Sequence, residues 1–307
     1  MINRSSRLGG PILFASAGIF QYLGAALAVG LFVQVAPSGV VWWRIAAGSV
    51  FLMLEWRPWR QEWTWRKIGV AVSFGLALAG MNFLFYEAIA RLSLGTTVAI
   101  EFVGPVAVAV FRGRTKRTWV AALLAFVGVA LIGGLGLNLG SGSVLTGFLF
   151  ALGAAGAWAA YILIGSTIAD TSKPGHSLSV VLAVASVLLL PFFGSQAFAP
   201  FTGGGGVVGV SAAAPSALTA SPSESPWILF ACLVGVGLLS TTLPYSLEAI
   251  AFTKLSASLF ALLTALLPAT STIVGATALG QVPNLAQILG LVMVSAAVWI
   301  AGRGKSV

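Results

Sequence analysis

The chain has 307 residues, of which 58% are hydrophobic and only 7% are charged, and its mean hydropathy is +1.01. A soluble domain carries about 25% charged residues, so this composition excludes a soluble enzyme and a secreted disulfide scaffold. Because a membrane-spanning helix uses roughly 20 apolar residues, about ten such helices fit in this length, with about 100 residues left for loops and tails. We therefore expect a polytopic membrane protein.

Apolar runs of spanning length follow one another along the chain. The first run, from Leu8 to Val35, is too long for the apolar part of a signal peptide, so we expect it to remain as a helix. The expected helices cover residues 11–33, 38–56, 68–90, 94–111, 118–136, 144–165, 178–199, 227–252, 255–279 and 284–302. The predicted fold class is therefore an all-α membrane protein with ten transmembrane helices.

The formal net charge of +9 comes from basic residues that cluster in the short loops between the apolar runs. With the N-terminus in the cytoplasm, fourteen of the sixteen Lys and Arg residues fall on the cytoplasmic side: Arg4, Arg7, Arg57, Arg60, Arg66, Lys67, Arg112, Arg114, Lys116, Arg117, Lys173, Lys254, Arg303 and Lys305. Of the other two, Arg91 falls outside and Arg44 lies within the second helix. We therefore expect both termini to be cytoplasmic. A nucleic-acid partner is not expected, since no basic stripe with interleaved aromatic residues lies on a soluble segment.

An internal repeat supports this topology. Ala88-x-x-Arg91-Leu92-Ser93 followed by Pro105 matches Ala251-x-x-Lys254-Leu255-Ser256 followed by Pro268, at a constant offset of 163 residues. Five helices in each half is an odd number, so the second copy must be inverted with respect to the first. Inverted repeats are typical of transporters, with the substrate site near the middle of the membrane.

The two repeats are expected at residues 8–136 and 144–302. Within the second, residues 200–226 are rich in Gly, Ser and Pro and contain no Lys or Arg, which indicates a flexible external loop.

Enzymatic sites are missing from the sequence. Gly304-Lys305-Ser306 resembles the end of a phosphate-binding loop, but Trp299 stands where the leading Gly is required. The single Asp170 cannot form an aspartyl pair, and the single His176 cannot form a paired-His metal site. We expect no enzyme activity, no cofactor and no metal, so uphill transport would use an ion gradient or substrate exchange.

Glu101 is the most informative charged residue, because a charge near the middle of a membrane helix costs roughly 2.5 kcal/mol or more. Pro105 withdraws the backbone donor that would bind the carbonyl of Glu101, and so loosens the helix at this carboxyl group. A buried carboxyl group can exchange a proton as access alternates. A structural hydrogen bond to a neighbouring helix is the alternative.

For the other charged residues within helices, the sequence allows more than one role. Arg44 either neutralises a carboxylate in a cavity or extends towards the membrane surface. Glu87 and Arg91 are four residues apart, which favours an ion pair over a ligand site. Glu248 lies near the inner end of its helix, where an interfacial role is equally plausible.

Polar and aromatic side chains also interrupt the apolar helices. Asn82 and Tyr86 can share one helix face, as can Trp158 and Tyr161, and Tyr245 interrupts another helix. Aromatic faces with nearby donors suit a small ammonium-bearing solute. Contacts that hold helices together are the alternative for each of them.

Four stretches resemble bacterial threonine/homoserine exporters of the EamA family, in the drug/metabolite transporter superfamily. They are Gly80-Met81-Asn82-Phe83-Leu84-Phe85-Tyr86, Glu101-Phe102-x-Gly104-Pro105, Gly153-Ala154-x-Gly156-Ala157-Trp158-Ala159-x-Tyr161-Ile162 and Ser240-Thr241-x-Leu243-Pro244-Tyr245-Ser246-Leu247-Glu248. The resemblance implies two inverted five-helix repeats and a cavity lined by both. It also implies export of small amino acids across the inner membrane by proton antiport.

The match departs from the family pattern in two places. Leu267 precedes Pro268 where the family usually has Glu, and the helix ends in Leu279-Gly280-Gln281 where Leu-Gly-Glu is common. Glu101 gains importance as the clearest remaining carboxylate in the middle of the membrane.

The leading hypothesis is therefore alternating-access export of threonine-like or homoserine-like neutral amino acids in exchange for protons. Glu101 would carry the proton, Pro105 and Pro268 would kink their helices, and the expected partners are the solute, protons and membrane lipid. The substrate-binding residues would be Arg44, Asn82, Tyr86, Trp158, Tyr161 and Tyr245. The alternatives are efflux of drugs or aromatic metabolites, and a scaffold or lipid-handling protein without transport. The sequence indicates no oligomeric state.

Overall fold

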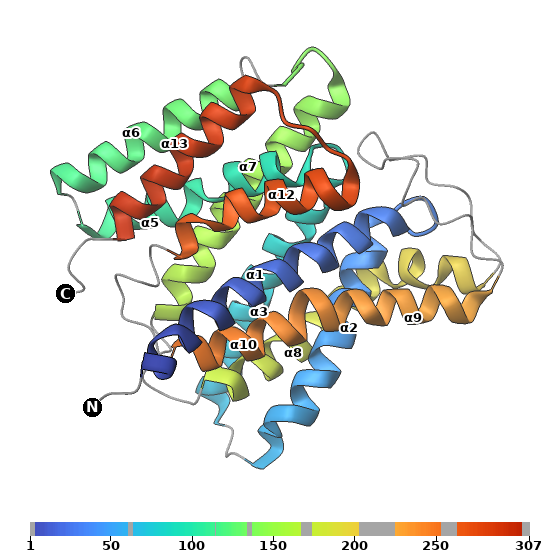
Figure 1. Ribbon diagram of the computed structural model, residues 1–307. Helices are drawn as coiled ribbons and strands as arrows, with labels where there is room; N and C mark the ends of the chain where they lie inside the picture. The colour runs from blue at the N-terminus through green and yellow to red at the C-terminus, as the bar shows by residue number, and fades with distance from the viewer. Residues whose placement is uncertain are drawn as a thin grey trace.

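The computed structural model describes residues 4–60, 64–113, 115–133, 137–166, 174–202, 225–252 and 263–302. These residues form only helices and the turns that join them (Figure 1). In chain order they are α1 (Arg4–Leu31), α2 (Pro37–Trp56), η1 (Pro58–Arg60), α3 (Trp65–Ile89), α4 (Leu94–Glu101), α5 (Val103–Gly113), α6 (Lys116–Leu131), α7 (Gly142–Ser166), α8 (Pro174–Phe198), η3 (Ala199–Phe201), α9 (Pro226–Gly237), the π-helical turn η4 (Leu238–Thr242), α10 (Leu243–Phe252), α12 (Leu267–Leu279) and α13 (Leu285–Gly302). Most of the expected loop 200–226, and Lys254 of the second repeat copy, lie outside these ranges.

Seven helical segments within the described residues are long and apolar enough to cross a membrane. They are Gly10–Leu31, Pro37–Trp56, Ile68–Ile89, Leu94–Arg112, Gly142–Ile164, Leu178–Phe201 and Pro226–Glu248. Two shorter apolar helices, Leu263–Leu279 and Leu285–Ala301, and the 16-residue α6 occupy the remaining expected positions. The prediction of an all-helical polytopic membrane protein is confirmed.

Two of the long segments are interrupted, each close to a proline. The segment that starts at Leu94 breaks at Phe102, between α4 and α5, where Pro105 has no N–H to offer the carbonyl of Glu101. In the segment that starts at Pro226, the π-helical turn η4 separates α9 from α10. There Pro244 has no N–H for the carbonyl of Ser240, and the N–H of Leu243 donates to Leu238 instead. Both interruptions therefore leave backbone carbonyls without their α-helical donors.

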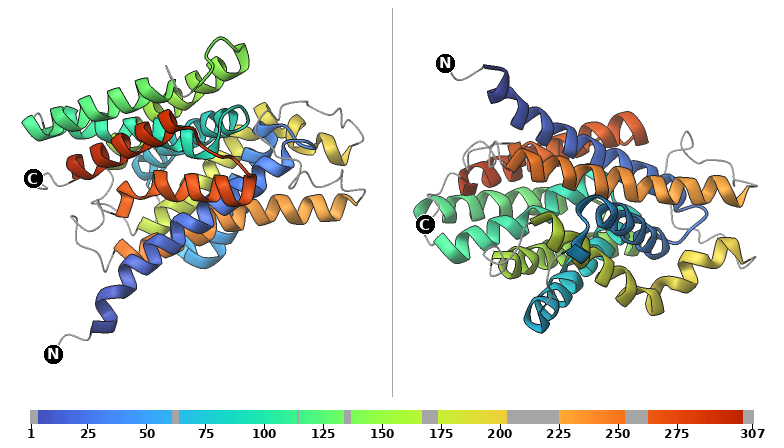
Figure 2. Two further views of the ribbon diagram at one scale, coloured as in Figure 1. Left: turned by 45° about the horizontal axis from the view of Figure 1, so that its top comes forward. Right: turned by 90° about the horizontal axis from the view of Figure 1, so that it is seen from below.

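The most extensive helix contacts join the first part of the chain to the second. α2 packs along α8, α3 along α7, α1 along α10, α4 along α12 and α6 along α13. Figure 2 shows the resulting bundle from two further sides. In Figure 1, α1 begins and α13 ends on the same side of the bundle. The two halves are interleaved, so any space at the centre is walled by both.

The contact between α2 and α8 is fixed by tryptophans. The indole N–H groups of Trp42 and Trp43 donate to the backbone carbonyls of Ser186 and Ala197, each at 3.0 Å. These bonds satisfy the polar atoms of two large aromatic side chains inside a membrane protein. These two bonds therefore fix the register of α2 against α8.

The contact between α6 and α13 depends on two glycines. A Cβ atom on Gly128 would lie 2.8 Å from the carbonyl oxygen of Gly290, and one on Gly290 would lie 2.5 Å from that of Gly128. Small residues allow membrane helices to approach this closely. Gly156 differs from these two glycines, because a Cβ atom on it would meet no atom of the described residues within 4 Å outside its own helix, so it is not a position of close helix packing there.

Candidate functional site

A cavity with both polar and apolar lining residues lies between the two halves of the bundle. It contains about 870 Å³ of empty space, part of it open to the surroundings. α1, α2, α3, α4, α7, α10 and α12 all contribute to its wall. The lining residues are Gln21, Tyr22, Ala25, Arg44, Met81, Asn82, Phe85, Glu101, Phe102, Trp158, Tyr161, Tyr245, Glu248 and Leu267. The cavity thus brings together Arg44, Asn82, Glu101, Trp158, Tyr161 and Tyr245 from the sequence prediction.

Arg44 is held by the π-helical turn of the opposite half. Its Nε donates to Oγ1 of Thr241 at 3.1 Å, and its Nη2 donates to the backbone carbonyl of Ser240 at 3.0 Å. That carbonyl is available because Pro244 cannot donate to it. Arg44 is 5% exposed, and within the described part of the chain its Nη1 has no hydrogen-bond partner. Unused guanidinium donors therefore line the cavity.

Glycines on α1 and α2 allow the π-helical turn to come close to Arg44. A Cβ atom on Gly24 would lie 2.6 Å from Cβ of Ser240, and one on Gly48 would lie 2.7 Å from Cγ2 of Thr241. Neither position has room for a side chain. The two residues that bind Arg44 are thus pressed directly against the backbones of two helices of the first half.

Tyr86, expected in the binding site, does not line the cavity. It is fully buried, and its ring centroid lies 5.2 Å from Cζ of Arg44. Phe32 meets the same ring edge-on, with the two centroids 6.1 Å apart. The hydroxyl of Tyr86 has no hydrogen-bond partner among the described residues. Tyr86 therefore supports Arg44 from behind through its aromatic face.

Glu101 is the last residue of α4, at the interruption near Pro105. Its side chain is 8% exposed and lines the cavity. Arg44 is its charged neighbour, but no ion pair within 4 Å joins them among the described residues. The carboxyl group also has no hydrogen-bond partner there, so the structure gives no support to a purely structural hydrogen bond for it. A partly shielded carboxyl that faces a cavity can gain and lose a proton there.

Aromatic contacts hold the two α7 residues in place. The ring of Trp158 meets Phe102 edge-on at a centroid distance of 4.8 Å, and Tyr161 stacks on Phe74 at 4.2 Å. Asn82 is 3% exposed, and its Nδ2 donates to the carbonyl of Leu78 on its own helix at 2.7 Å. Asn82 is among the residues that line the cavity.

Three polar lining residues were not predicted as site residues. Gln21 and Tyr22 lie on α1, whose sequence reads as an apolar run with isolated polar residues. The sequence places Glu248 near the inner end of its helix, but in the structure it lines the cavity with Tyr245, three residues earlier. The spacing of Tyr245 and Glu248 on one helix face was the available signal.

The two kink prolines lie at different places relative to their helices. Pro105 is within α5, after the break at Phe102. Pro268 is in the first turn of α12 and follows a turn at Leu266. In both cases the break in the helix falls just before the proline, and a cavity-lining residue is next to the break. Glu101 directly precedes Phe102, and Leu267 directly follows Leu266.

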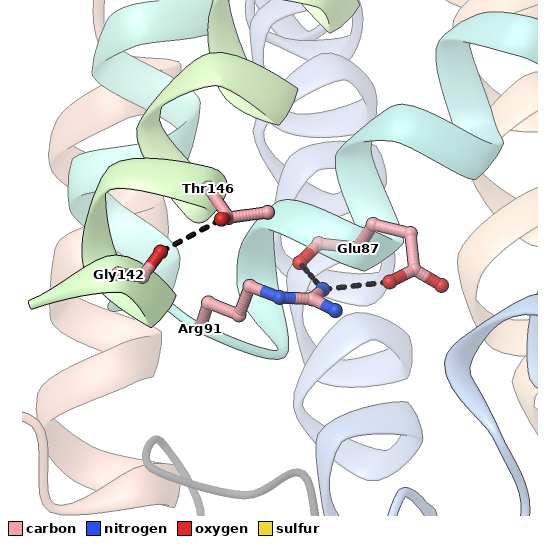
Figure 3. A network of polar contacts seen from close by, with 4 residues as sticks. All are labelled: Glu87, Arg91, Gly142 and Thr146. Atoms are coloured by element: carbon pink, nitrogen blue, oxygen red, sulfur yellow. Dashed lines mark hydrogen bonds and ion pairs between the residues drawn. The ribbon is translucent and has the colours of Figure 1, made fainter.

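The predicted pair of Glu87 and Arg91 is present. Nη1 of Arg91 donates to Oε2 and to the backbone carbonyl of Glu87, both at 2.6 Å, as Figure 3 shows. The start of α7, with Gly142 and Thr146, lies close by. Neither residue lines the cavity, and their ion pair joins two successive turns at the end of α3.

A broken helix from each half, and a shared central cavity whose charged groups form no ion pair among the described residues, define a membrane transporter. Within the described residues, no group of three or more His, Cys, Asp or Glu side chains is placed to hold a metal ion. The comparison with known families agrees, since residues 145–303 match the EamA-like transporter family. The chain belongs to that family, which is a family of transporters and not of enzymes.

Individual relatives extend this match over most of the chain. The threonine/homoserine exporter RhtA of Salmonella typhimurium strain LT2 is 34% identical over 274 residues, covering 89% of this chain and 84% of the relative. RhtA of Escherichia coli K12 is 33% identical over the same shares. The uncharacterized transporter YwfM of Bacillus subtilis strain 168 is 24% identical over 81% of this chain and 78% of its own length. A similar crystal structure, 17% identical, covers 97% of this chain and 96% of its own with a TM-score of 0.59, which supports the fold alone.

Proposed function

We propose that this protein exports threonine, homoserine or similarly sized neutral amino acids across the bacterial inner membrane in exchange for protons. The observation that carries the proposal is a buried Arg44 in a cavity that also contains the carboxyl group of Glu101. Among the described residues, Arg44 has unused donors and Glu101 has no ion pair. Two relatives at 33–34% identity are exporters of threonine and homoserine. A substrate of this size needs a carboxylate-binding group and a proton-carrying group, and the cavity offers both.

Arg44 would bind the substrate carboxylate. A guanidinium group binds a carboxylate through two parallel hydrogen bonds, and burial strengthens such a contact. The π-helical turn and the ring of Tyr86 hold Arg44 in one position, so no ordering of its long side chain is required when substrate binds. Asn82, Trp158, Tyr161 and Tyr245 would shape the rest of the cavity.

Glu101 would couple transport to the proton gradient. When the cavity faces outward, a proton from outside binds Glu101. When it faces inward, the proton leaves and the negative carboxylate is again adjacent to Arg44. Exchange requires that the proton-bound and the substrate-bound cavity cross the membrane in opposite directions, so Glu101 would release its proton on the side where substrate binds. The break in the helix at Phe102 would allow the carboxyl group to change its exposure.

We further propose that residues 8–136 and 144–302 are two inverted five-helix repeats with both termini in the cytoplasm. The helix pairings support this, because exchanging the two halves converts the contact of α3 with α7 into that of α10 with α1. The contacts of α2 with α8, and of α6 with α13, are unchanged by the same exchange. Alternating access would then arise from the two halves exchanging conformations.

Transport in proteoliposomes tests the proposal. Labelled threonine inside the vesicles should leave faster when the outside is acidified, and exchange with external unlabelled threonine should proceed without a pH gradient. Glu101→Gln should keep the exchange and lose the acceleration by pH. Glu87→Gln, which changes a carboxylate outside the cavity, is the matched control. If Glu101→Gln retains full acceleration, the coupling role is wrong.

Efflux of aromatic metabolites is the second candidate. The rings of Phe102, Trp158 and Tyr161 on one side of the cavity favour it, since they offer stacking surfaces. Vesicles loaded with a labelled aromatic cation, in parallel with vesicles loaded with labelled threonine, separate the two. Exchange of the aromatic cation, without exchange of threonine or homoserine, would support the second candidate over the first.

A further inference from the structure

Glu248 is a second carboxyl group in the cavity that the proposed function does not use. It lies on α10, three residues after Tyr245, and both side chains line the cavity. Among the described residues it has no ion pair within 4 Å and no hydrogen bond. A carboxylate in this position is costly unless a proton or a cationic group accompanies it.

The charged groups in the cavity are unevenly distributed. Arg44 is the charged neighbour of Glu101, whereas no charged residue acts comparably on Glu248 within the described chain. A cation placed next to Glu101 would also be close to Arg44 and would be repelled by it. The same cation next to Glu248 would meet a carboxylate without this competing positive charge. Glu248 is therefore the better partner for a positive group on the substrate.

Three tyrosines share the cavity with Glu248. Tyr22 on α1, Tyr161 on α7 and Tyr245 on α10 all lie within electrostatic range of its carboxyl group and line the cavity. With Tyr86 beneath Arg44, they are all four tyrosines of the chain. A carboxylate flanked by aromatic rings is a favourable site for an ammonium group, through ionic and cation–π attraction.

The residue that binds Arg44 lies on the same helical segment as Glu248. Thr241 binds Arg44, and Glu248 follows seven residues later, which is roughly 10 Å along a helix axis. Helical side chains lean towards the N-terminus of their helix, so that of Glu248 leans towards the turn that holds Arg44. A ligand with an anionic and a cationic end can therefore lie along α10 between the two.

The sequence repeat shows that only the second half has a carboxyl group at the position of Glu248. At the offset of 163 residues, Tyr245 corresponds to Asn82 and Glu248 corresponds to Phe85. All four residues line the cavity. The first half thus presents an aromatic side chain where the second presents a carboxylate, so these two corresponding positions of the cavity wall differ in charge. That difference would fix the orientation of a dipolar substrate.

We propose that Glu248 binds the ammonium group of the substrate and thereby makes the cavity selective for zwitterions over monocarboxylates. This inference rests on the proposed function, in which Arg44 binds the carboxylate. Glu101 is then left free to carry the proton. The two carboxyl groups have separate tasks: Glu248 determines which solute binds, and Glu101 couples its movement to protons.

The test compares two competitors in threonine exchange by proteoliposomes at equal pH on both sides. One is unlabelled threonine, and the other is 3-hydroxybutanoate, which lacks the ammonium group. Wild type should prefer threonine, because a hydrogen bond to a charged group is worth about 1.5–3 kcal/mol, or roughly 10-fold to 150-fold in affinity. Glu248→Gln should raise the KM for threonine at least about tenfold and remove most of this preference. Because the preference is a ratio measured on one variant, a smaller amount of folded protein does not change it.

One control variant and two contrary outcomes make the result decisive. Glu55→Gln is the matched control, since Glu55 is exposed at the end of α2 and accepts a hydrogen bond from Ser246, which a Gln oxygen can also accept. It should leave both KM and preference unchanged. If Glu248→Gln keeps the preference of wild type, or loses only the response to an imposed pH gradient, Glu248 does not bind the ammonium group. If wild type exchanges no small amino acid at all, the proposed function itself fails.

Discussion

Oε1 of Gln281 accepts a hydrogen bond from the backbone N–H of Leu94 at 2.9 Å, and this bond joins the end of α12 to the start of α4. The N–H of Leu94 is in the first turn of its helix, where no helical acceptor exists. Gly280, with φ of 63°, ends α12 and turns Gln281 back towards α4. A small second cavity at this junction is lined by Ser93 and Gln281, among other residues. The sequence topology puts this junction on the external side, so the bond would close that side of the transporter.

Gln281→Leu should weaken this external closure. Losing a hydrogen bond of about 1 kcal/mol would raise the open population roughly fivefold. The measurement is the labelling rate of Ser93→Cys by a membrane-impermeant maleimide added to intact cells, in a Cys232→Ser background without other cysteines. Gln281→Glu, which keeps a side-chain acceptor, should label at the rate of the parent. Equal rates for the Leu and Gln forms would show that the bond does not control access.

Pro244→Ala should weaken substrate binding without touching the cavity. An alanine N–H can donate to the carbonyl of Ser240, so it competes with Nη2 of Arg44 for that acceptor. We expect the KM for threonine to rise about threefold to tenfold, the equivalent of one hydrogen bond. Pro226→Ala, in the first turn of α9 where no donor is required, should leave the KM unchanged. An unchanged KM in Pro244→Ala would mean that Arg44 does not depend on this carbonyl.

Gly24→Ala should destabilise the protein. Its methyl group would lie 2.6 Å from Cβ and 2.7 Å from N of Ser240, and a backbone shift is the only relief. Overpacking of this kind costs about 1–3 kcal/mol, visible as a lower Tm in detergent. Gly80→Ala is the matched control, because within the described part of the chain its added methyl group would meet no neighbouring helix within 4 Å. It should keep or raise the Tm, since alanine favours a helix by about 0.5–1 kcal/mol. A Tm for Gly24→Ala as high as that of Gly80→Ala would contradict the close contact.

Two substitutions at Tyr86 separate its ring from its hydroxyl. Tyr86→Phe removes a buried hydroxyl without a described partner, so the Tm should stay equal or rise, and threonine transport should be unaffected. Tyr86→Leu removes the ring beneath Arg44 and should raise the KM about twofold to tenfold, given a cation–π contribution of about 0.5–1 kcal/mol or more. A loss of transport in Tyr86→Phe would mean that the hydroxyl contacts substrate.

The sequence was most informative where a single physical quantity decides the structure. Spanning helices follow from about 20 apolar residues in a row, so their positions could be predicted to within a few residues. Prolines likewise marked the break near Glu101, because a missing N–H acts locally. The π-helical turn was not predicted, since it depends on Gly24, Gly48 and Arg44, which are far from it in sequence.

The candidate site was only partly predictable, because it too depends on contacts between residues far apart in the sequence. Helical spacing shows which residues share a face, but it does not show which neighbouring helix covers each edge of that face. Asn82 lines the cavity with Phe85, while Tyr86 turns beneath Arg44. Glu248 was judged by its distance from the end of the apolar run. Its place in the cavity depends on the packing of α10 against α1, which no local pattern contains.

The glycine contacts described above also limit how the helices can move. Gly48 meets Thr241 where α2 crosses the π-helical turn, and its neighbours one turn away are Arg44 and Leu52. If α2 moved along its axis by one turn, the side chain of Arg44 or Leu52 would have to fit where Gly48 has only a hydrogen atom. Gly128 and Gly290 impose the same restriction where α6 crosses α13. Translation along the helix axes is therefore blocked, and the crossing points can serve only as pivots for tilting.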